Sequence, residues 1–341
     1  MHLVPIALNP MMDNISDFYD AAIDGDVIQV RELLKIGINP DSDANEDGWS
    51  PLFAASASGH EEVASILIFT GVNINKPIQS GATPLHIAAY RGYNDIVSIL
   101  ISSGASIDQD GCTSLFLAAQ DSQIEMGATP LFIAAENGHK VILSALISAG
   151  ANVNQAVNDG TMSVFVAAQY GHLDIVSILT SAGADVNQAN KAPLFIAAQG
   201  GHADILSALI NAGTNVNQPT NNGWTPLHVA AQNGHADTAF ALISAGVDIA
   251  QANEDIYTIL RIGANPLFVA AENNQKDIVA FLNTAGANVN LARDIGATPL
   301  YVAAQKGHSS IVSTLIDAGL NVNVTLNDGW TQLMTAVNND H

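Results

Sequence analysis

The chain has one cysteine, few basic residues and no long apolar run. Cys112 is the single cysteine among 341 residues, which excludes an intrachain disulfide and favours a reducing, cytoplasmic setting. No apolar stretch approaches the ~20 residues that a membrane-spanning helix needs, so we expect no membrane insertion. The apolar N-terminus lacks a basic segment and contains Pro5 and Pro10, which makes it a poor match to a signal peptide.

Charged residues are scarce and mostly acidic. They make up 12% of the chain, about half of the usual ~25%. The 32 Asp and Glu residues against 10 Lys and Arg residues give a formal net charge of −22. This charge would repel nucleic acid and anionic membranes, and it would steer a basic protein partner toward the chain. Because 48% of the residues are hydrophobic, the chain can bury a large apolar surface and is not disordered.

A segment of the form Thr-Pro-Leu-Phe/His-x-Ala-Ala recurs along the chain. Full copies begin at Thr83, Thr129 and Thr225, with a tyrosine-containing copy at Thr298 and several weaker ones. The proline, or its substitute, stands at positions 51, 84, 114, 130, 163, 193, 226, 266, 299 and 332. The spacing is 30 to 33 residues except for one gap of 16 and one of 40. Such a period predicts a stack of repeats rather than several closed domains.

Each part of the repeat predicts a local structure. A hydroxyl residue before proline is typical of a helix start, because the hydroxyl caps free N–H groups and proline needs no donor there. A Gly-His pair follows this first helix and indicates a turn. The second helix has apolar residues at Ile96, Val97, Leu100 and Ile101 in one copy, and it ends at a glycine such as Gly104. The stretch after that glycine is predicted to be an extended arm that leads into a turn.

In motif, spacing and order the sequence resembles the ankyrin repeat from residue 17 to the C-terminus. The resemblance implies an all-α ankyrin-repeat solenoid of helix-turn-helix units with β-hairpin loops. We expect about nine to ten repeats, one of which lacks its second helix. No unit can bury its apolar faces alone, so stacking between units supplies the stability.

The expected boundaries follow from this register. Residues 1–16 would be poorly ordered or packed on the cap, and residues 17–341 would form the repeat domain with a polar capping repeat at 17–46. The truncated repeat at 111–126 has a first-helix pattern without a second. The half repeat at 329–341 also lacks a second helix, so we expect that end to fray or the natural chain to continue.

An extra apolar segment occupies residues 254–262. Three interpretations stay open for this insertion: a decayed repeat copy packed on the stack, an extended finger, or a binding element. Tyr257 is its candidate contact residue.

The ten histidines raise the question of a metal site. Six share the turn position (His60, His139, His172, His202, His235 and His308), and His86 and His228 share the position after Pro-Leu. These rows do not converge with cysteines or carboxylates at ligand spacing, so structural hydrogen bonding is the better interpretation. Motifs for serine hydrolases, phosphate loops and dinucleotide binding are absent from the sequence. We therefore predict no catalytic residue, no metal, no cofactor and no enzymatic activity.

The ankyrin resemblance implies binding at a concave surface made of hairpin tips and first helices. Two variable positions matter: two residues before the proline marker, and six or seven residues after it. Aromatic residues and arginine are the usual anchors of protein interfaces. The candidate protein-binding residues are therefore Trp49, Tyr90, Arg91, Tyr170, Trp224 and Tyr257. For the tryptophans the alternative is packing over the neighbouring hairpin.

The first functional hypothesis is a monomeric scaffold or adaptor that binds a partner protein through the concave face, and the net charge favours a basic partner. The alternative is a recognition arm of a larger effector, channel or enzyme polypeptide that continues beyond this chain. A purely structural spacer is the third. The near-identical repeats resemble those of ankyrin proteins from intracellular bacteria, protists and large viruses, which suggests a host-directed effector delivered to a host cytosol.

Overall fold

The computed structural model describes residues 10–43, 47–109, 127–187, 192–251, 263–293, 296–327, 329–331 and 334. The truncated repeat at 111–126 and the insertion at 254–262 lie outside the described residues, as do residues 1–9 and most of the half repeat at 329–341. The described part contains eighteen α-helices and no named strand. This confirms the all-α repeat architecture.

The helices form nine consecutive pairs. The first helices of the pairs are α1 (Pro10–Asp24), α3 (Pro51–Ser58), α5 (Pro84–Arg91), α7 (Pro130–Glu136), α9 (Ser163–Gln169), α11 (Pro193–Gly200), α13 (Pro226–Asn233), α15 (Pro266–Glu272) and α17 (Pro299–Gln305). The second helices are α2 (Val27–Lys35), α4 (Glu61–Phe69), α6 (Asn94–Ser102), α8 (Lys140–Ser148), α10 (Leu173–Ser181), α12 (Ala203–Asn211), α14 (Ala236–Ser244), α16 (Lys276–Thr284) and α18 (Ser309–Asp317). Helix α1 starts at Pro10, before residue 17 where the repeat register begins.

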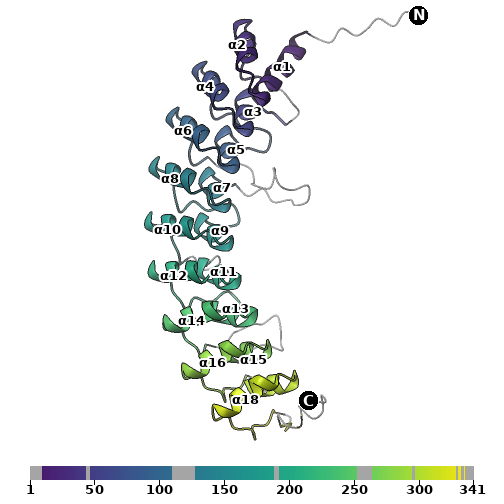
Figure 1. Cartoon of the computed structure of the whole chain (residues 1–341), viewed down its shortest axis with the longest axis vertical. Helices are drawn as coiled ribbons and strands as arrows, with labels where there is room; N and C mark the ends of the chain where they lie inside the picture. The colour runs from purple at the N-terminus through teal and green to yellow at the C-terminus, as the bar shows by residue number, and fades with distance from the viewer. Residues whose placement is uncertain are drawn as a thin grey trace, which may run out of the picture. The chain divides into compact units, whose positions relative to one another are not determined.

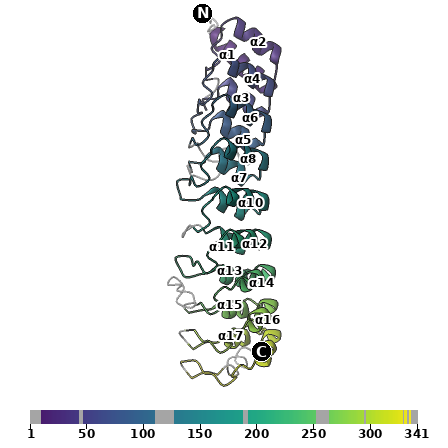
Figure 2. The same cartoon turned by 90° about the vertical axis from the view of Figure 1, so that its left-hand side faces the viewer.

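The chain packs into two compact units, residues 1–167 with 181–184, and residues 168–180 with 185–341. In the first unit α1, α3, α5 and α7 pack in succession as one layer, and α2, α4, α6 and α8 form a second layer (Figure 1). The second unit repeats this arrangement with α11, α13, α15 and α17 against α12, α14, α16 and α18. Within each unit the loops between pairs project away from the second helices (Figure 2).

The first helices start as their sequence predicts. The hydroxyl of Thr129 accepts a hydrogen bond from the N–H of Phe132 at 3.2 Å, and the hydroxyl of Ser50 accepts one from Phe53 at 3.2 Å. In both helices proline occupies the first turn, where it has no N–H to leave unpaired. Asn265 replaces the hydroxyl residue in α15, and its side chain accepts from Phe268 at 2.9 Å. The hydroxyl-cap prediction is confirmed at α3 and α7, and an asparagine takes the same role at α15.

Turns within pairs use left-handed backbone. Gly59 caps α3 with φ 84°, a conformation that costs glycine little. The corresponding turn after α15 has no glycine, and Asn274 adopts φ 60° there. It is the single non-glycine residue with positive φ in the described part of the chain. An asparagine, one of the few residues that tolerate this region, therefore takes the place of glycine in this turn.

The core runs along the interface of the two helix layers in each unit. Helix α5 is buried from Pro84 to Ala89, and its small alanines sit where helices approach closely. On α6, Ile96, Val97 and Leu100 are buried as predicted. In the described residues after α1, exposed side chains lie mainly at the ends of first helices, on the outer sides of second helices and in the turns and loops.

Candidate protein-binding surface

Successive loops are joined by a row of side-chain acceptors. In the first unit, Asn75 Oδ1 accepts from the N–H of Ser106 at 2.7 Å. In the second unit the same position is used by Asn187, Asn217 and Asn290, which accept from Asn215 (2.8 Å), Asp248 (2.7 Å) and Asn321 (2.9 Å). We call this row the loop ladder. Sequence reasoning did not predict it, although the repeated asparagine four residues after the helix-ending glycine was its visible signal.

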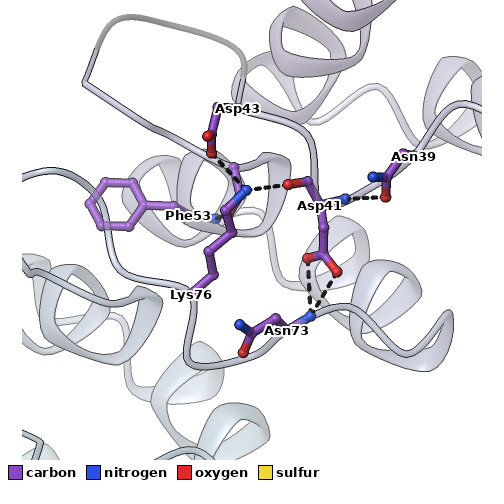
Figure 3. Close-up of polar contacts among 7 residues, drawn as sticks. Asn39, Asp41, Asp43, Phe53, Asn73 and Lys76 are labelled. Carbon is purple, nitrogen blue, oxygen red and sulfur yellow. Dashed lines mark hydrogen bonds and ion pairs between the residues drawn. The ribbon is translucent and has the colours of Figure 1, made fainter.

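The first loops of the chain carry a more elaborate version of the ladder (Figure 3). Both carboxylate oxygens of Asp41 lie within reach of the N–H of Asn73, at 3.0 and 3.1 Å. The ammonium of Lys76 donates to the carbonyl of Asp41 and lies 2.6 Å from Asp43 Oδ1. These contacts fix the loop after α2 against the loop after α4, so these two loops present a defined surface.

The turn histidines hold neighbouring repeats together. The Nε2 atom of His60 hydrogen-bonds the carbonyl of Ile23 at 2.7 Å, and His139 reaches Tyr90 at 3.0 Å. His235 and His308 bond the carbonyls of Gln199 (2.9 Å) and Glu272 (3.2 Å) in the same way. The structural interpretation of these four histidines is confirmed. In the described residues no three His, Cys, Asp or Glu side chains gather in a way that could hold a metal ion.

The two histidines after Pro-Leu are helix caps. At α13 the N–H of Thr225 donates to His228 Nδ1 at 3.2 Å, and His228 Nε2 donates to the carbonyl of Ala264 at 3.1 Å. Burial lowers the pKa of His228 to about 4, although its bond to the Ala264 carbonyl acts in the opposite direction. His228 is therefore neutral at physiological pH. His86 caps α5 through the same bond to Thr83.

The two candidate tryptophans pack against neighbouring side chains. The ring of Trp49 meets Phe53 edge-on at a centroid distance of 4.6 Å and lies 6.3 Å from Tyr19. Trp224 is 8% exposed, and its ring lies 5.6 Å from that of His228. Trp224 therefore offers little free surface, and Trp49 is partly buried against the cluster of Phe53, Ile78 and Ile87.

The end of α5 brings two candidates together in the first unit. Tyr90 packs, partly buried, against the cluster of Phe53, Ile78 and Ile87. Arg91 is exposed, and its guanidinium carbon lies 5.9 Å from the centroid of the Tyr90 ring. The exposed cation of Arg91 thus lies over the partly buried ring of Tyr90.

Tyr170 follows α9 in the second unit. It is 54% exposed, and its ring lies 6.4 Å from the ring of His172. It occupies the same repeat position as Arg91. Tyr257 lies outside the described residues.

Comparisons with known proteins agree with this geometry. The family model described as Ankyrin repeats (3 copies) matches residues 70–126, 120–190, 187–253 and 267–341, and the single Ankyrin repeat model matches residues 47–78. The chain belongs to the ankyrin-repeat family. The crystal structure of the human ASB11 ankyrin repeat domain is similar, with a TM-score of 0.57 and 25% identity. The match covers 67% of this chain and 96% of that one.

A curated relative matches a short segment of this chain. Glycerophosphocholine phosphodiesterase gde1 of Schizosaccharomyces pombe is 40% identical over 52 residues, which is 15% of this chain and 5% of that protein. This chain therefore spans a small fraction of that relative, and the named activity belongs to the relative as a whole.

The ankyrin fold makes the described part of this chain a protein-interaction domain. In the described residues after α1, the first helices are mostly buried and their exposed side chains stand at the last positions, as Gln169, Gln199 and Gln305 do. Among the described helices none is both long and apolar enough to cross a membrane.

Proposed function

We propose that this ankyrin-repeat chain is a scaffold or adaptor that binds a partner protein through the concave face of first helices and loop tips. One observation carries the proposal. Along α5 the residues from Pro84 to Ala89 are buried, whereas Arg91, at the end of the helix, is exposed beside Tyr90. The equivalent position after α9 displays Tyr170. These side chains are more suited to a protein interface than the glutamine and asparagine found elsewhere in the row.

Rigidity supports the same proposal. Tyr90 is held by the Phe53, Ile78 and Ile87 cluster, and His139 bonds its carbonyl. The loops beside it are joined by the loop ladder. An interface on such a scaffold loses little conformational entropy when a partner binds. The net charge of −22 favours a partner that is basic where it meets this face.

We infer further that the chain binds rather than catalyses, as a monomer in a reducing compartment such as the cytosol. The turn histidines His60, His139, His235 and His308 are engaged with backbone carbonyls, and His228 is buried and neutral. These side chains hold the repeats together. The single cysteine fits the compartment.

The experiment compares partner capture by the intact chain and by the triple variant Tyr90→Ala, Arg91→Ala, Tyr170→Ala. We expect the triple variant to lose specific partners that the wild type retains. The matched control replaces three exposed serines of second helices, Ser98, Ser177 and Ser207, with alanine, and it should retain those partners. Identical partner sets for wild type and the tyrosine–arginine variant would refute the placement of the surface and favour a structural spacer.

A second candidate is a recognition arm within a larger effector, channel or enzyme polypeptide. The observation that favours it is the match to gde1, where the shared segment covers 5% of the relative. An antibody raised against this chain should then detect a natural product much larger than 35.5 kDa on immunoblots of its source cells. A single band at the mass of this chain would exclude the second candidate.

A further inference from the structure

Helix α14 displays a phenylalanine on its outer side. Phe240 is 54% exposed, and it stands five residues after the turn residue His235. Six other second helices carry serine at this position, and α16 carries Ala280. A large exposed aromatic residue is therefore a departure from the repeat pattern rather than part of it.

The inner side of the same helix carries smaller residues than the equivalent side of α12. Thr238 and Ala239 are buried where α12 buries Ile205 and Leu206. The hydroxyl of Thr238 is buried without a hydrogen-bond partner in the described part of the chain. Helix α14 thus turns its largest apolar residue outward and a small polar residue inward. Packing of the stack does not account for this choice, because a residue kept for stability would face the core.

A second aromatic ring lies beside the first. Phe281 of α16 is half-buried, and its ring centroid is 5.3 Å from that of Phe240 at an interplanar angle of 53°. Helices α14 and α16 are neighbours in the second-helix layer of their unit (Figure 1). The pair forms an apolar patch on the outer side of second helices, separate from the first-helix positions of the proposed function.

Carboxylates flank this patch. Asp237 precedes Phe240 by three residues and Asp277 precedes Phe281 by four, so each lies on the same helix face as its phenylalanine. Both aspartates are exposed. Helices α12, α14 and α16 together contain Asp204, Asp237 and Asp277 against the single basic residue Lys276. The surroundings of the patch are acidic.

We propose that the outer sides of α14 and α16 form a second docking surface, which accepts a basic amphipathic helix of a partner protein. The apolar side of that helix covers Phe240 and Phe281, and its lysines or arginines lie beside Asp237 and Asp277. A second copy of this chain fits poorly, because each copy carries a formal charge of −22 and would present the same carboxylates. This surface is independent of the first-helix face, so either proposal can fail without the other.

The test uses the whole chain and a labelled amphipathic helical peptide of leucine and lysine. Its control is a peptide of the same composition in scrambled order, which keeps the charge but has no apolar side. Fluorescence anisotropy at physiological salt gives both dissociation constants. We expect the amphipathic peptide to bind at least ten times more tightly than the scrambled one. Equal affinities would mean that net charge alone attracts the peptide, and the proposal would be overturned.

Matched variants locate the binding. Phe240→Ser introduces the residue that six other second helices carry, so the fold should tolerate it. We expect it to weaken binding of the amphipathic peptide about tenfold. Phe69→Ser removes a phenylalanine of α4 that is 94% exposed, and it should leave the affinity unchanged. An unchanged affinity in the Phe240 variant, or an equal loss in the Phe69 variant, overturns the proposal.

Two further measurements complete the test. Asp237→Asn should weaken binding at low salt and have a smaller effect at high salt, because its contribution is screened. Sedimentation velocity of the chain alone should show a monomer. A dimer that Phe240→Ser converts to a monomer would assign the patch to a second copy and contradict the proposed partner.

Discussion

The side-chain Oδ1 of Asn217 accepts a hydrogen bond from the backbone N–H of Asp248, 31 residues later, at 2.7 Å. This contact joins the loop after α12 to the loop after α14, so it acts between repeats rather than within one. We expect Asn217→Ala to lower the free energy of unfolding by about 1 kcal/mol, because the N–H of Asp248 loses its partner. Urea unfolding followed by circular dichroism would measure it.

The control for that prediction is Asn217→Asp, which keeps an acceptor oxygen in place. It should retain most of the stability that the alanine variant loses. If the two variants unfold at the same urea concentration, the contact between the loops does not contribute to stability.

Ala250 interrupts the loop ladder. It occupies the position of Asn217 in the next repeat, yet its side chain offers no acceptor for the loop that follows α16. Its backbone already has the required turn, since its N–H donates to Asp248 Oδ1 at 2.9 Å. We expect Ala250→Asn to raise the free energy of unfolding by about 1 kcal/mol. Thermal unfolding of this variant should show a higher midpoint than that of the wild type. Ala250→Val adds bulk without an acceptor, so its midpoint should not rise.

Asn274 carries backbone strain in the turn before α16. Its φ of 60° is left-handed, where an asparagine is tolerated but a glycine is unstrained. We expect Asn274→Gly to stabilise the chain by about 0.5–1 kcal/mol, as measured by denaturant midpoint. The neighbouring Asn273→Gly is the control: Asn273 has φ −101°, so glycine there only adds freedom to the unfolded chain and should destabilise.

His228 should make stability depend on pH. Its pKa is about 4 in the folded chain, below the ordinary 6.5, because burial disfavours the charged ring. The unfolded chain therefore binds a proton first as the pH falls. The stability that the neutral His228 contributes is fully present above about pH 6.5. It is lost progressively as the pH falls to about 4, and the loss is on the order of 3 kcal/mol.

The matched variant is His228→Phe, since the corresponding positions of α7 and α15 hold Phe132 and Phe268 behind a side-chain cap. Above pH 6.5 the unfolding midpoints of the wild type and the variant should change with pH in the same way. Below pH 6.5 the midpoint of the wild type should fall more steeply than that of the variant. Parallel curves from pH 7 to pH 4.5 would contradict the assignment to His228.

The structure also shows why some candidate residues could be chosen from sequence and others could not. Trp49 and Tyr90 both stand at variable positions of the repeat, yet both rings pack on the Phe53 cluster, whereas Arg91 and Tyr170 are exposed. Phe240 lies at an ordinary position of a second helix, and its exposure depends on how α14 is rotated against α16. The pattern marks which positions vary, whereas packing decides which of them reach solvent.

What the sequence by itself determined is the repeat: helix starts at Thr129 and Ser50, the left-handed turn at Gly59, and the buried face of α6. These features depend on neighbouring residues in the chain, because caps, proline and glycine act within one turn of backbone. Only the tertiary structure decided the contacts between repeats, such as the bond from Asp248 to Asn217 and the ring pair of Phe240 and Phe281. These depend on the rotation and spacing of stacked helices, which no single repeat encodes.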